Sequence, residues 1–289
     1  LFSNNKIDFL CLIPENSSRD YPIVCKSFKE KGEEWLTLWC FHKRGSCMQI
    51  TLRRFLDIDI FGRLLGLMQA QGTKRDFKNL EFSNASLSEH KDFVEYLNYL
   101  GIGNSLISTD CVYYLKRKEA KEVIVNYERL TGVKVRNIYC GNISKYGLGF
   151  KLRVRNVIFS NIILYSMNKV RKILVESKWD FNLTKLANAF FAKLLSGDGN
   201  IDLDTKDRNL PQGRIKITDI NTSHLKDYEN IMIKFGFKPK ISLKYIIVRS
   251  SFNLKQARWL LRIGAFKNNP NERRLKTFID ARTSLMKQV

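Results

Sequence analysis

The sequence predicts an α+β fold built from two similar halves, and three observations support this. One segment of about twenty residues recurs within the chain in diverged form. After each copy, strand-like and helix-like runs follow in the same order. Two apolar helical runs also end alike, in a polar residue followed by glycine, at Gln71-Gly72 and Asp198-Gly199. With 289 residues and 44% hydrophobic residues, the chain is long and apolar enough for one large or two ordinary packed domains.

The first predicted element is a β-rich extension, residues 1–55. The runs PIVCKSF, EWLTLWCFH and CMQITLRRF are rich in β-branched and aromatic residues and are separated by turn residues. From Asp57 the apolar residues recur at helical spacing, so IFGRLLGLMQAQ is predicted as a helix that stops at Gly72. We interpret Asp57, Asp59 and Asp76 as a cap, a turn residue and a surface charge.

The internal repeat gives the order of the remaining elements. SNASLSEHKDFVEYLNYLGI (83–102) matches TDINTSHLKDYENIMIKFGF (218–237), and each copy is predicted to be a capped helix that ends at a glycine, Gly101 or Gly236. Two strands and a helix are expected next: SLIS, CVYYLK and KEAKEVIVNYERL in the first copy, and KISLK, YIIVRS and NLKQARWLLRI in the second. A hairpin precedes each repeated helix, KRDFKNLEFS and the longer NIDLDTKDRNLPQGRIKITDI. Each copy therefore has the predicted order αββαββα.

These patterns predict four parts of the chain. They are the extension (1–55), a first repeat (56–132), an insert with two strands and a linker helix (133–180), and a second repeat with a C-terminal helix (181–289). The insert contains VRNIYC, GFKLRVR and NVIFSNIILYSMNKVRKIL.

The charge of the chain indicates a polyanionic partner. Fifty Lys and Arg against 28 Asp and Glu leave a net charge of +22. Nucleic acid is the first expectation, ahead of an anionic membrane surface or a heparin-like polymer. No run of about 18 apolar residues is present, so no membrane span is expected.

Cysteine and histidine usage argues against several other classes. The six cysteines form no CxxC pair, and Cys40, His42 and Cys47 fit no standard zinc-finger spacing, so we expect reduced cysteines in a cytoplasmic protein. None of the three histidines accompanies a plausible nucleophile, which gives Ser-His or Cys-His hydrolase chemistry little support.

The two glycine-ended helices suggest a metal-dependent reaction. If they pack side by side around a pseudo-two-fold axis, acidic residues at their ends converge and attract a divalent cation. A cation held between carboxylates and a phosphodiester activates water and stabilises the leaving oxygen.

LLGLMQAQG (64–72) and FAKLLSGDG (191–199), together with the ITLRRF lead-in and the αββαββα order, resemble the LAGLIDADG homing endonucleases in their single-chain, two-repeat form. The resemblance covers about residues 50 to 270. It implies a DNA-straddling saddle, a monomer that cuts double-stranded DNA at a specific site, and Mg²⁺ or another divalent cation as cofactor. It places the metal at Asp198 and Gln71 with Gly197 and Ala70 beside them. It also places basic residues near the scissile phosphates at Lys116 and Arg249, which lie at the ends of the predicted strands CVYYLK and YIIVR.

Cationic strand residues are the expected DNA contacts. Lys151, Arg153 and Arg155 alternate with Leu152 and Val154, which puts the cations on one face of a strand. Such a strand can enter the major groove and contact base edges and phosphates. The full expected set is Lys74, Arg75, Lys145, Lys151, Arg153, Arg155, Lys206, Arg208, Arg214 and Lys216.

The sequence departs from the family pattern at two positions. Gln71 stands where the family has its first metal-binding acid, and an amide supplies one weak carbonyl ligand without charge. Three interpretations stay open: a degenerate nuclease that still binds DNA, a nickase or poor cutter, or an engineered Glu-to-Gln change. Lys193 stands where a small residue often lies, so either it snorkels out of the helix interface or the helices cross further apart. The competing hypothesis is a non-catalytic DNA-binding regulator or an RNA maturase.

Overall fold

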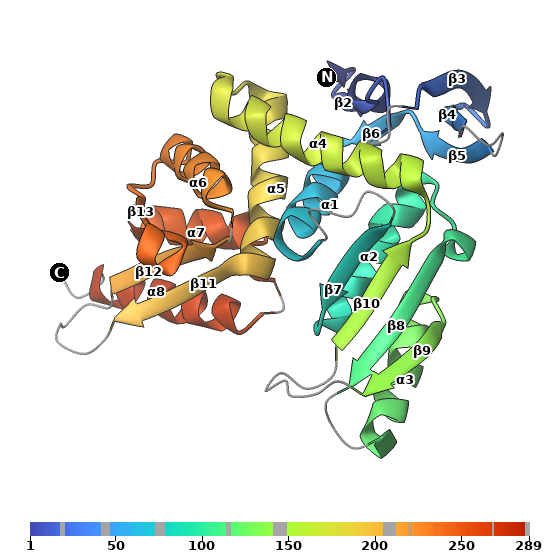
Figure 1. Ribbon diagram of the computed structural model, residues 1–289. Coiled ribbons are helices and arrows are strands. Elements are labelled where there is room, and N and C mark those ends of the chain that lie inside the picture. Colours follow the sequence, from blue (N-terminus) through green and yellow to red (C-terminus); the bar gives the residue numbers. More distant parts are fainter. Residues whose placement is uncertain are drawn as a thin grey trace. The chain divides into compact units, whose positions relative to one another are not determined.

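The computed structural model describes residues 1–17, 21–41, 47–72, 79–113, 117–140, 149–204, 212–219, 221–267 and 269–286 (Figure 1). The described chain is a mixed α+β structure, as the sequence predicts. It divides into two compact units, Leu1–Lys169 and Val170–Val289. Within the described residues, no helix is both long and apolar enough to span a membrane.

The extension is β-rich, as predicted, and forms two small antiparallel sheets. One contains β1 (Phe2–Ser3), β2 (Lys6–Asp8) and β6 (Phe55–Asp57), and the other contains β3 (Ile23–Glu30), β4 (Glu33–Phe41) and β5 (Cys47–Arg53). A short 3-10 helix, η1 (Phe9–Leu12), follows β2.

Side chains on β5 and after it tie the extension to the rest of the first unit. The Arg53 Nε donates to the Tyr99 carbonyl at 3.1 Å, and its guanidinium lies over the rings of Trp35 and Tyr99. Within the extension, Arg54 forms ion pairs with Asp8 and Glu34, each at 3.0 Å, and the Asn156 amide links β5 to the following part by donating to the Gln49 carbonyl at 3.2 Å. The extension is thus an integral part of the first unit.

The first unit continues through alternating helices and strands. They are α1 (Ile58–Gln71), β7 (Leu80–Asn84), α2 (Leu87–Leu100), η2 (Asn104–Leu106), β8 (Ile107–Tyr113), α3 (Arg117–Thr131), β9 (Val135–Cys140), β10 (Gly149–Val154) and α4 (Val157–Glu176), and the unit boundary falls within α4. The sheet has the order β7-β10-β8-β9, in which β10 is antiparallel to both neighbours and β8 is parallel to β9.

This order differs from the predicted one in the first copy. SLIS and CVYYLK were expected as a strand pair, but η2 and the single strand β8 occupy this stretch. Thr109 and Asp110 supply no tight turn between them, so the chain stays extended. The two strands expected in a separate insert, β9 and β10, complete this sheet instead.

The second unit has the predicted order. It contains α5 (Phe181–Asp198), β11 (Gly199–Asp204), β12 (Gln212–Thr218), α6 (Thr222–Lys234), β13 (Lys240–Ser242), η3 (Leu243–Tyr245), β14 (Ile247–Phe252), α7 (Leu254–Arg262) and α8 (Pro270–Met286). Its sheet is antiparallel throughout, with the order β11-β12-β14-β13.

The repeated helices α2 and α6 begin and end alike. Ser86 and Asn221 cap their N-termini with side-chain oxygens, as predicted. Gly101 and Gly236 take the left-handed conformation, with φ of 100° and 79°. The residue after each glycine donates to the fifth residue before it, Ile102 to Leu97 at 2.9 Å and Phe237 to Met232 at 3.0 Å.

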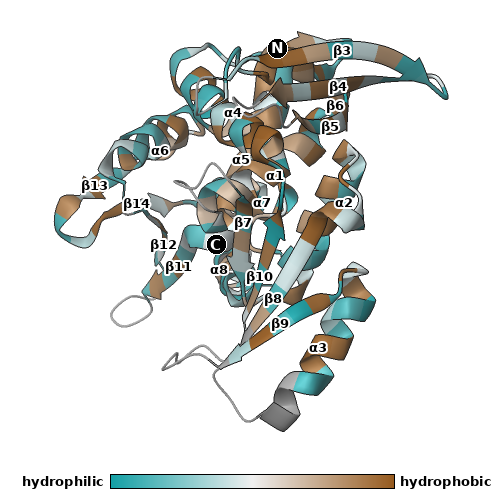
Figure 2. Ribbon diagram, turned by 45° about the vertical axis from the view of Figure 1, so that its right-hand side comes forward, coloured by the Kyte–Doolittle hydropathy of each residue, from teal (hydrophilic) through white to brown (hydrophobic). Residues whose placement is uncertain are grey.

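The buried side chains recur along the chain at the spacings expected for helices and strands. Figure 2 shows α1 as a largely hydrophobic helix, and Leu64, Leu65, Leu67 and Met68 in it are fully buried. In the sheet of the second unit, Ile201, Ile215, Ile217 and Val248 are buried, and the residues between them face outward. The sheet of the second unit therefore presents one apolar face to its own core and one polar face to solvent.

Candidate nucleic-acid interface

The ends of α1 and α5 have the same backbone geometry. Gly72 (φ −85°, ψ 161°) and Gly199 (φ −87°, ψ 150°) follow the helices in extended conformation, and each N–H donates to the carbonyl four residues earlier. A Cβ on Gly72 would lie 2.6 Å from the Met68 carbonyl oxygen, and one on Gly199 would lie 2.8 Å from the Leu195 Cα. Close passage over the last helical turn, rather than a positive φ, therefore requires glycine at both positions.

This turn leaves Gln71 and Asp198 as the last residues of their helices, each partly exposed. The donors present are oxygens: the Asp198 carboxylate, the Gln71 amide carbonyl and the carbonyls of the final turns, including those of Ala70 and Gly197. The partial negative charge of a helix C-terminus also favours a cation. Among the described residues, no group of three or more His, Cys, Asp or Glu gathers as a ready-made metal site. At the end of α5 alone, Asp198 offers one carboxylate with the Gly197 carbonyl beside it, and Mg²⁺ is usually held by one or two carboxylates together with water and phosphate.

A buried polar cluster supports the strand beside Asp198. The Thr218 hydroxyl donates a long hydrogen bond of 3.5 Å to the Asp198 carbonyl. The neighbouring Asp219 is buried, accepts from the Tyr228 hydroxyl at 2.9 Å and lies 3.1 Å from His224 Nδ1. Burial first, and then the charge of Asp219 with a contribution from Asp198, hold the pKa of Tyr228 well above its usual value.

Our sequence interpretation missed this cluster, although the repeat contains a signal for it. At the matching positions of the first copy stand Asn84, Glu89 and Phe93, so these positions do not repeat the combination of Asp219, His224 and Tyr228. A difference between two otherwise matched segments marks a position with its own role.

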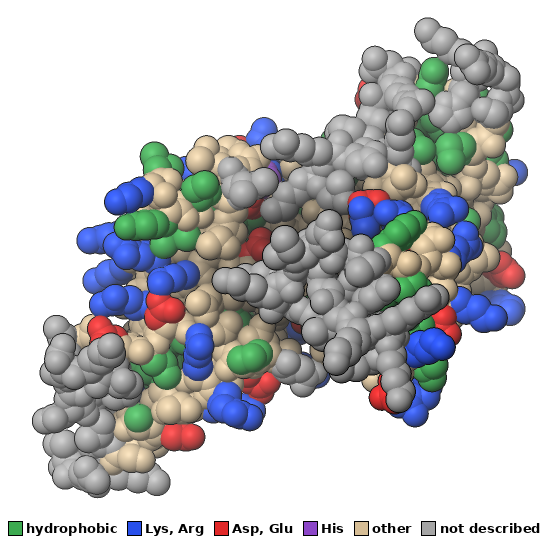
Figure 3. Space-filling model, turned by 60° about the horizontal axis from the view of Figure 1, so that its bottom comes forward, with side chains coloured by type: hydrophobic (Ala, Val, Ile, Leu, Met, Phe, Trp, Pro, Cys, Tyr) green, Lys and Arg blue, Asp and Glu red, His purple; other side chains and the backbone are tan. Residues whose placement is uncertain are grey.

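The outward face of the second sheet is cationic. Arg214 and Lys216 alternate with buried Ile215 and Ile217, as the sequence predicts. Lys216 pairs with Asp202 on the neighbouring strand, and Arg214 lies 3.9 Å from Asp204. Figure 3 shows Lys and Arg side chains gathered over the elements of this unit.

Arg249 was expected at a strand end, but it lies in the middle of β14. There it pairs in register with Lys216 on one side and Lys240 on the other, so three cations form a row across the sheet. A hollow of about 300 Å³ opens beside this row, lined by Arg214, Lys238, Lys240, Arg249, Ser250 and Ser251. Like charges held in register repel each other, and an anion between them would relieve this repulsion.

The outward face of the first sheet is balanced rather than cationic. Lys151 and Arg153 alternate with buried Leu152 and Val154, as predicted. Both cations bond to Glu81, at 2.6 and 2.5 Å. Arg153 also pairs with Asp110, which accepts from the Asn137 amide at 2.8 Å.

Burial of Glu81 opposes its ionisation, but the hydrogen bonds and charges of Lys151 and Arg153 outweigh burial and lower its pKa. Our sequence interpretation missed Glu81 and Asp110 because their strands become neighbours of β10 only in the fold. Arg155, just beyond β10, is exposed.

The remaining candidates are distributed as follows. Lys74, Arg75, Lys116, Lys145, Lys206 and Arg208 lie outside the described residues. Of the two alternatives for Lys193, snorkelling does not fit, because only 3% of the residue is exposed.

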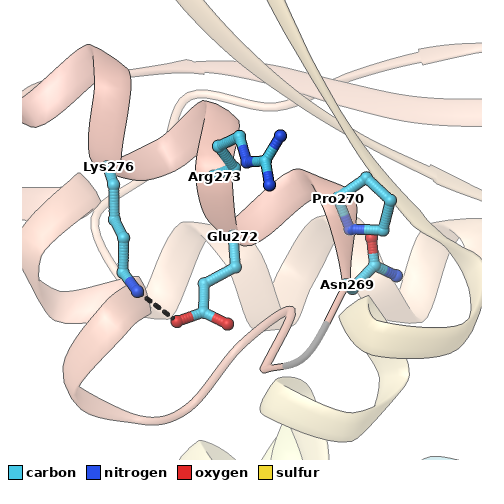
Figure 4. A pocket seen from close by; sticks show the side chains of 5 residues that line it. All are labelled: Asn269, Pro270, Glu272, Arg273 and Lys276. Carbon is cyan, nitrogen blue, oxygen red and sulfur yellow. Dashed lines mark ion pairs between the residues drawn. The ribbon is translucent and has the colours of Figure 1, made fainter.

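A second hollow, of about 520 Å³, lies at the start of α8 and is lined by Asn269, Pro270, Glu272, Arg273 and Lys276 (Figure 4). Glu272 and Lys276 pair at 2.7 Å, so its charges are partly balanced. Asn269 donates to the Ser196 carbonyl at 3.2 Å and Asn271 to the Gly199 carbonyl at 3.4 Å. This segment therefore braces the end of α5.

Comparisons with known proteins give structural neighbours alone. No family model and no curated protein matches the chain. Among solved structures, it is similar to the I-SmaMI LAGLIDADG homing endonuclease bound to cleaved DNA, with 11% identity, a TM-score of 0.40, and coverage of 79% of this chain and 89% of that one. It is similar to I-GzeII in complex with its DNA target, with 11% identity, a TM-score of 0.35, and coverage of 97% and 91%. It is also similar to I-LtrWI bound to target DNA, with 11% identity, a TM-score of 0.32, and coverage of 97% of this chain and 90% of that one. These solved structures are all LAGLIDADG homing endonucleases, the family that the two glycine-ended motifs resemble.

Proposed function

We propose that this protein binds double-stranded DNA as a monomer and is a site-specific endonuclease of homing type whose cleavage is weakened or abolished by Gln71. The observation that carries the proposal is the pair of helices with identical glycine turns. One ends in Asp198 and the other in Gln71, and the glycine after each leads on toward a sheet with a polar outward face.

Duplex DNA is the partner that the sheet faces suit best. Their outward residues include Lys, Arg, Asp, Glu, Asn, Gln and Ser, the side chains that reach phosphates and base edges from a β-ribbon. The net charge of +22 favours a polyanion of any sequence, and the varied polar groups favour discrimination among sequences.

The chemistry at the helix ends would depend on a divalent cation. Asp198, with the Gly197 carbonyl beside it, would hold the ion on the second unit, and Gln71 with Ala70 would offer neutral oxygens on the first. The bound ion would supply charge stabilisation and an activated water for phosphodiester hydrolysis. Because Gln71 is neutral, a site formed by both helix ends would have one negative charge fewer than two acids would give, and we expect weaker cation binding.

Gln71 also favours a second candidate, a nuclease-derived protein without catalysis that acts as a DNA-binding regulator or an RNA maturase. The protein's preferred nucleic acid separates these. Selection from a pool of randomised duplexes, with structured RNA as competitor, should enrich one family of DNA sequences. Enrichment of RNA in place of duplex would favour the maturase, and equal retention of all duplexes would contradict site-specific recognition.

A further inference from the structure

The turn between β13 and β14 exposes large apolar side chains to solvent. Leu243 is 67% exposed, Tyr245 62% and Ile246 38%, and they follow one another within four residues. Lys244 lies over the Tyr245 ring at 5.4 Å, so a cation accompanies the aromatic group. Single exposed apolar residues are ordinary on protein surfaces, but three at one hairpin tip form a local apolar feature.

The backbone holds this tip in an unfavourable conformation. Ile246 has φ 50° and ψ 49°, a region that a β-branched residue rarely adopts. Its N–H donates to the Leu243 carbonyl at 3.2 Å, and its own carbonyl accepts from the Asp219 N–H at 3.3 Å. Strain that the surrounding structure maintains in this way is concentrated at functional sites.

The tip lies next to the cationic hollow. Lys240 and Arg249, in register across β13 and β14, are separated from the turn by two further residue pairs. Of the four cations in the hollow, Arg214 alone has an acidic partner within 4.0 Å in the described part of the chain, at 3.9 Å from Asp204. The hollow therefore keeps a strong positive charge that an acidic ligand would balance.

The tip also lies at the same end of the sheet as Asp198. Gly199 is in register with Ile217, and the next residue, Thr218, is in register with Ile247 at the end of the turn. Gly199, the residue after Asp198, and Ile247, at the end of the turn, are thus separated by about two strand spacings, roughly 10 Å. A nucleic acid facing Asp198 passes within reach of Tyr245.

We propose that the β13–β14 tip is a nucleic-acid contact in which the cationic hollow holds a backbone phosphate and Tyr245, flanked by Leu243, packs against a base of the duplex near Asp198. The inference rests on the proposed function and adds to it a stacking residue that distorts or grips one strand. Charge complementarity identifies the occupant, and stacking on an exposed ring beside a cationic groove is a general mode of nucleic-acid binding. At the matching stretch of the first unit the chain is the continuous strand β8, so the contact belongs to one half alone.

Two kinds of variant separate the two parts of the contact. Binding of a random-sequence duplex is followed by fluorescence anisotropy across a series of KCl concentrations. Tyr245→Ala should weaken binding at least 5-fold with an unchanged salt dependence, because a stacking contact displaces no counterions. The double variant Lys240→Ala with Arg249→Ala should flatten the slope of log K against log[salt] by roughly 1 to 2. Phe181→Ala, at a 77% exposed aromatic residue on α5, is the matched control and should change neither quantity.

A duplex with 2-aminopurine at successive positions then locates the stacked base, whose fluorescence should change with wild type and not with Tyr245→Ala. Thermal melts confirm that each variant is folded. The inference is overturned, while the proposed function stands, if the wild-type protein binds duplex and both Tyr245→Ala and the Lys240→Ala, Arg249→Ala double variant bind it with the same affinity and salt dependence. If the wild-type protein does not bind duplex at all, both are overturned.

Discussion

Replacing Gly199 by alanine tests the geometry on which the helix-end site depends. The new Cβ would lie 2.8 Å from the Leu195 Cα, and the Leu195 carbonyl oxygen would be closer still. Both are backbone atoms of the helix that carries Asp198, so no side-chain rotation relieves the overlap. Ordinary contact needs a shift of roughly 0.5 to 1 Å, and overpacking of this kind costs about 1–3 kcal/mol.

The expected result is a lower melting temperature in a variant that still folds. For a unit of this size, 1 kcal/mol corresponds to a shift of about 4 °C, so Gly199→Ala should melt roughly 4–12 °C below wild type. Gly236→Ala is the control: its φ is 79°, which strains alanine, but nothing lies within 4 Å of the added Cβ. Its cost should be about 1 kcal/mol. The close-passage argument would be refuted if calorimetry gave Gly199→Ala the melting temperature of the wild type, or a melting temperature above that of Gly236→Ala.

Three further predictions concern the polar groups. His90 is buried and its pKa is lowered to about 4, because burial disfavours its charged form. The unfolded chain takes up this proton below about pH 6.5, so the free energy of unfolding of the wild type should fall by about 3 kcal/mol from pH 6.5 to 4. Urea unfolding of His90→Phe should lack this contribution to the pH dependence of stability. Glu81→Gln frees Lys151 on the sheet face, so the salt slope of duplex binding should steepen by roughly 1, whereas the exposed helix residue in Glu95→Gln should leave it unchanged. Tyr228→Phe removes a hydrogen-bond donor from buried Asp219 and should cost about 1–3 kcal/mol in urea unfolding; an unchanged midpoint would mean that Asp219 does not need this bond.

Local patterns predicted much of the fold because local interactions determine those features. The caps at Ser86 and Asn221, the glycine ends of α2 and α6, and the alternation around Lys151 and Arg153 all depend on residues a few positions apart. Strand pairing in the first unit depends on segments far apart in the sequence, and no local sequence pattern indicates that β10 lies between β7 and β8. The same limit hid Glu81 and Asp110, which meet Arg153 only through that pairing.

The position of Arg249 shows a related limit. The run YIIVRS predicted a strand correctly, but each boundary was two residues off, so Arg249 lies inside the strand, in the middle of a cationic row, and not at its end. Of the two alternatives for Lys193, snorkelling fails for a different reason. A lysine in an apolar helix is expected to reach solvent, and the sequence does not show how completely α5 is covered.

Cleavage by a restored acid pair tests the central claim most directly. A library of supercoiled plasmids with randomised inserts is incubated in Mg²⁺ with wild type, Gln71→Glu, or Gln71→Glu combined with Asp198→Asn, and the cut ends are sequenced. The proposed function predicts that Gln71→Glu linearises a defined family of inserts, that wild type cuts them much more slowly or not at all, and that the double variant loses the gain. Equal outcomes for Gln71→Glu and the double variant, with duplex binding intact, would contradict a metal-dependent site at these two helix ends.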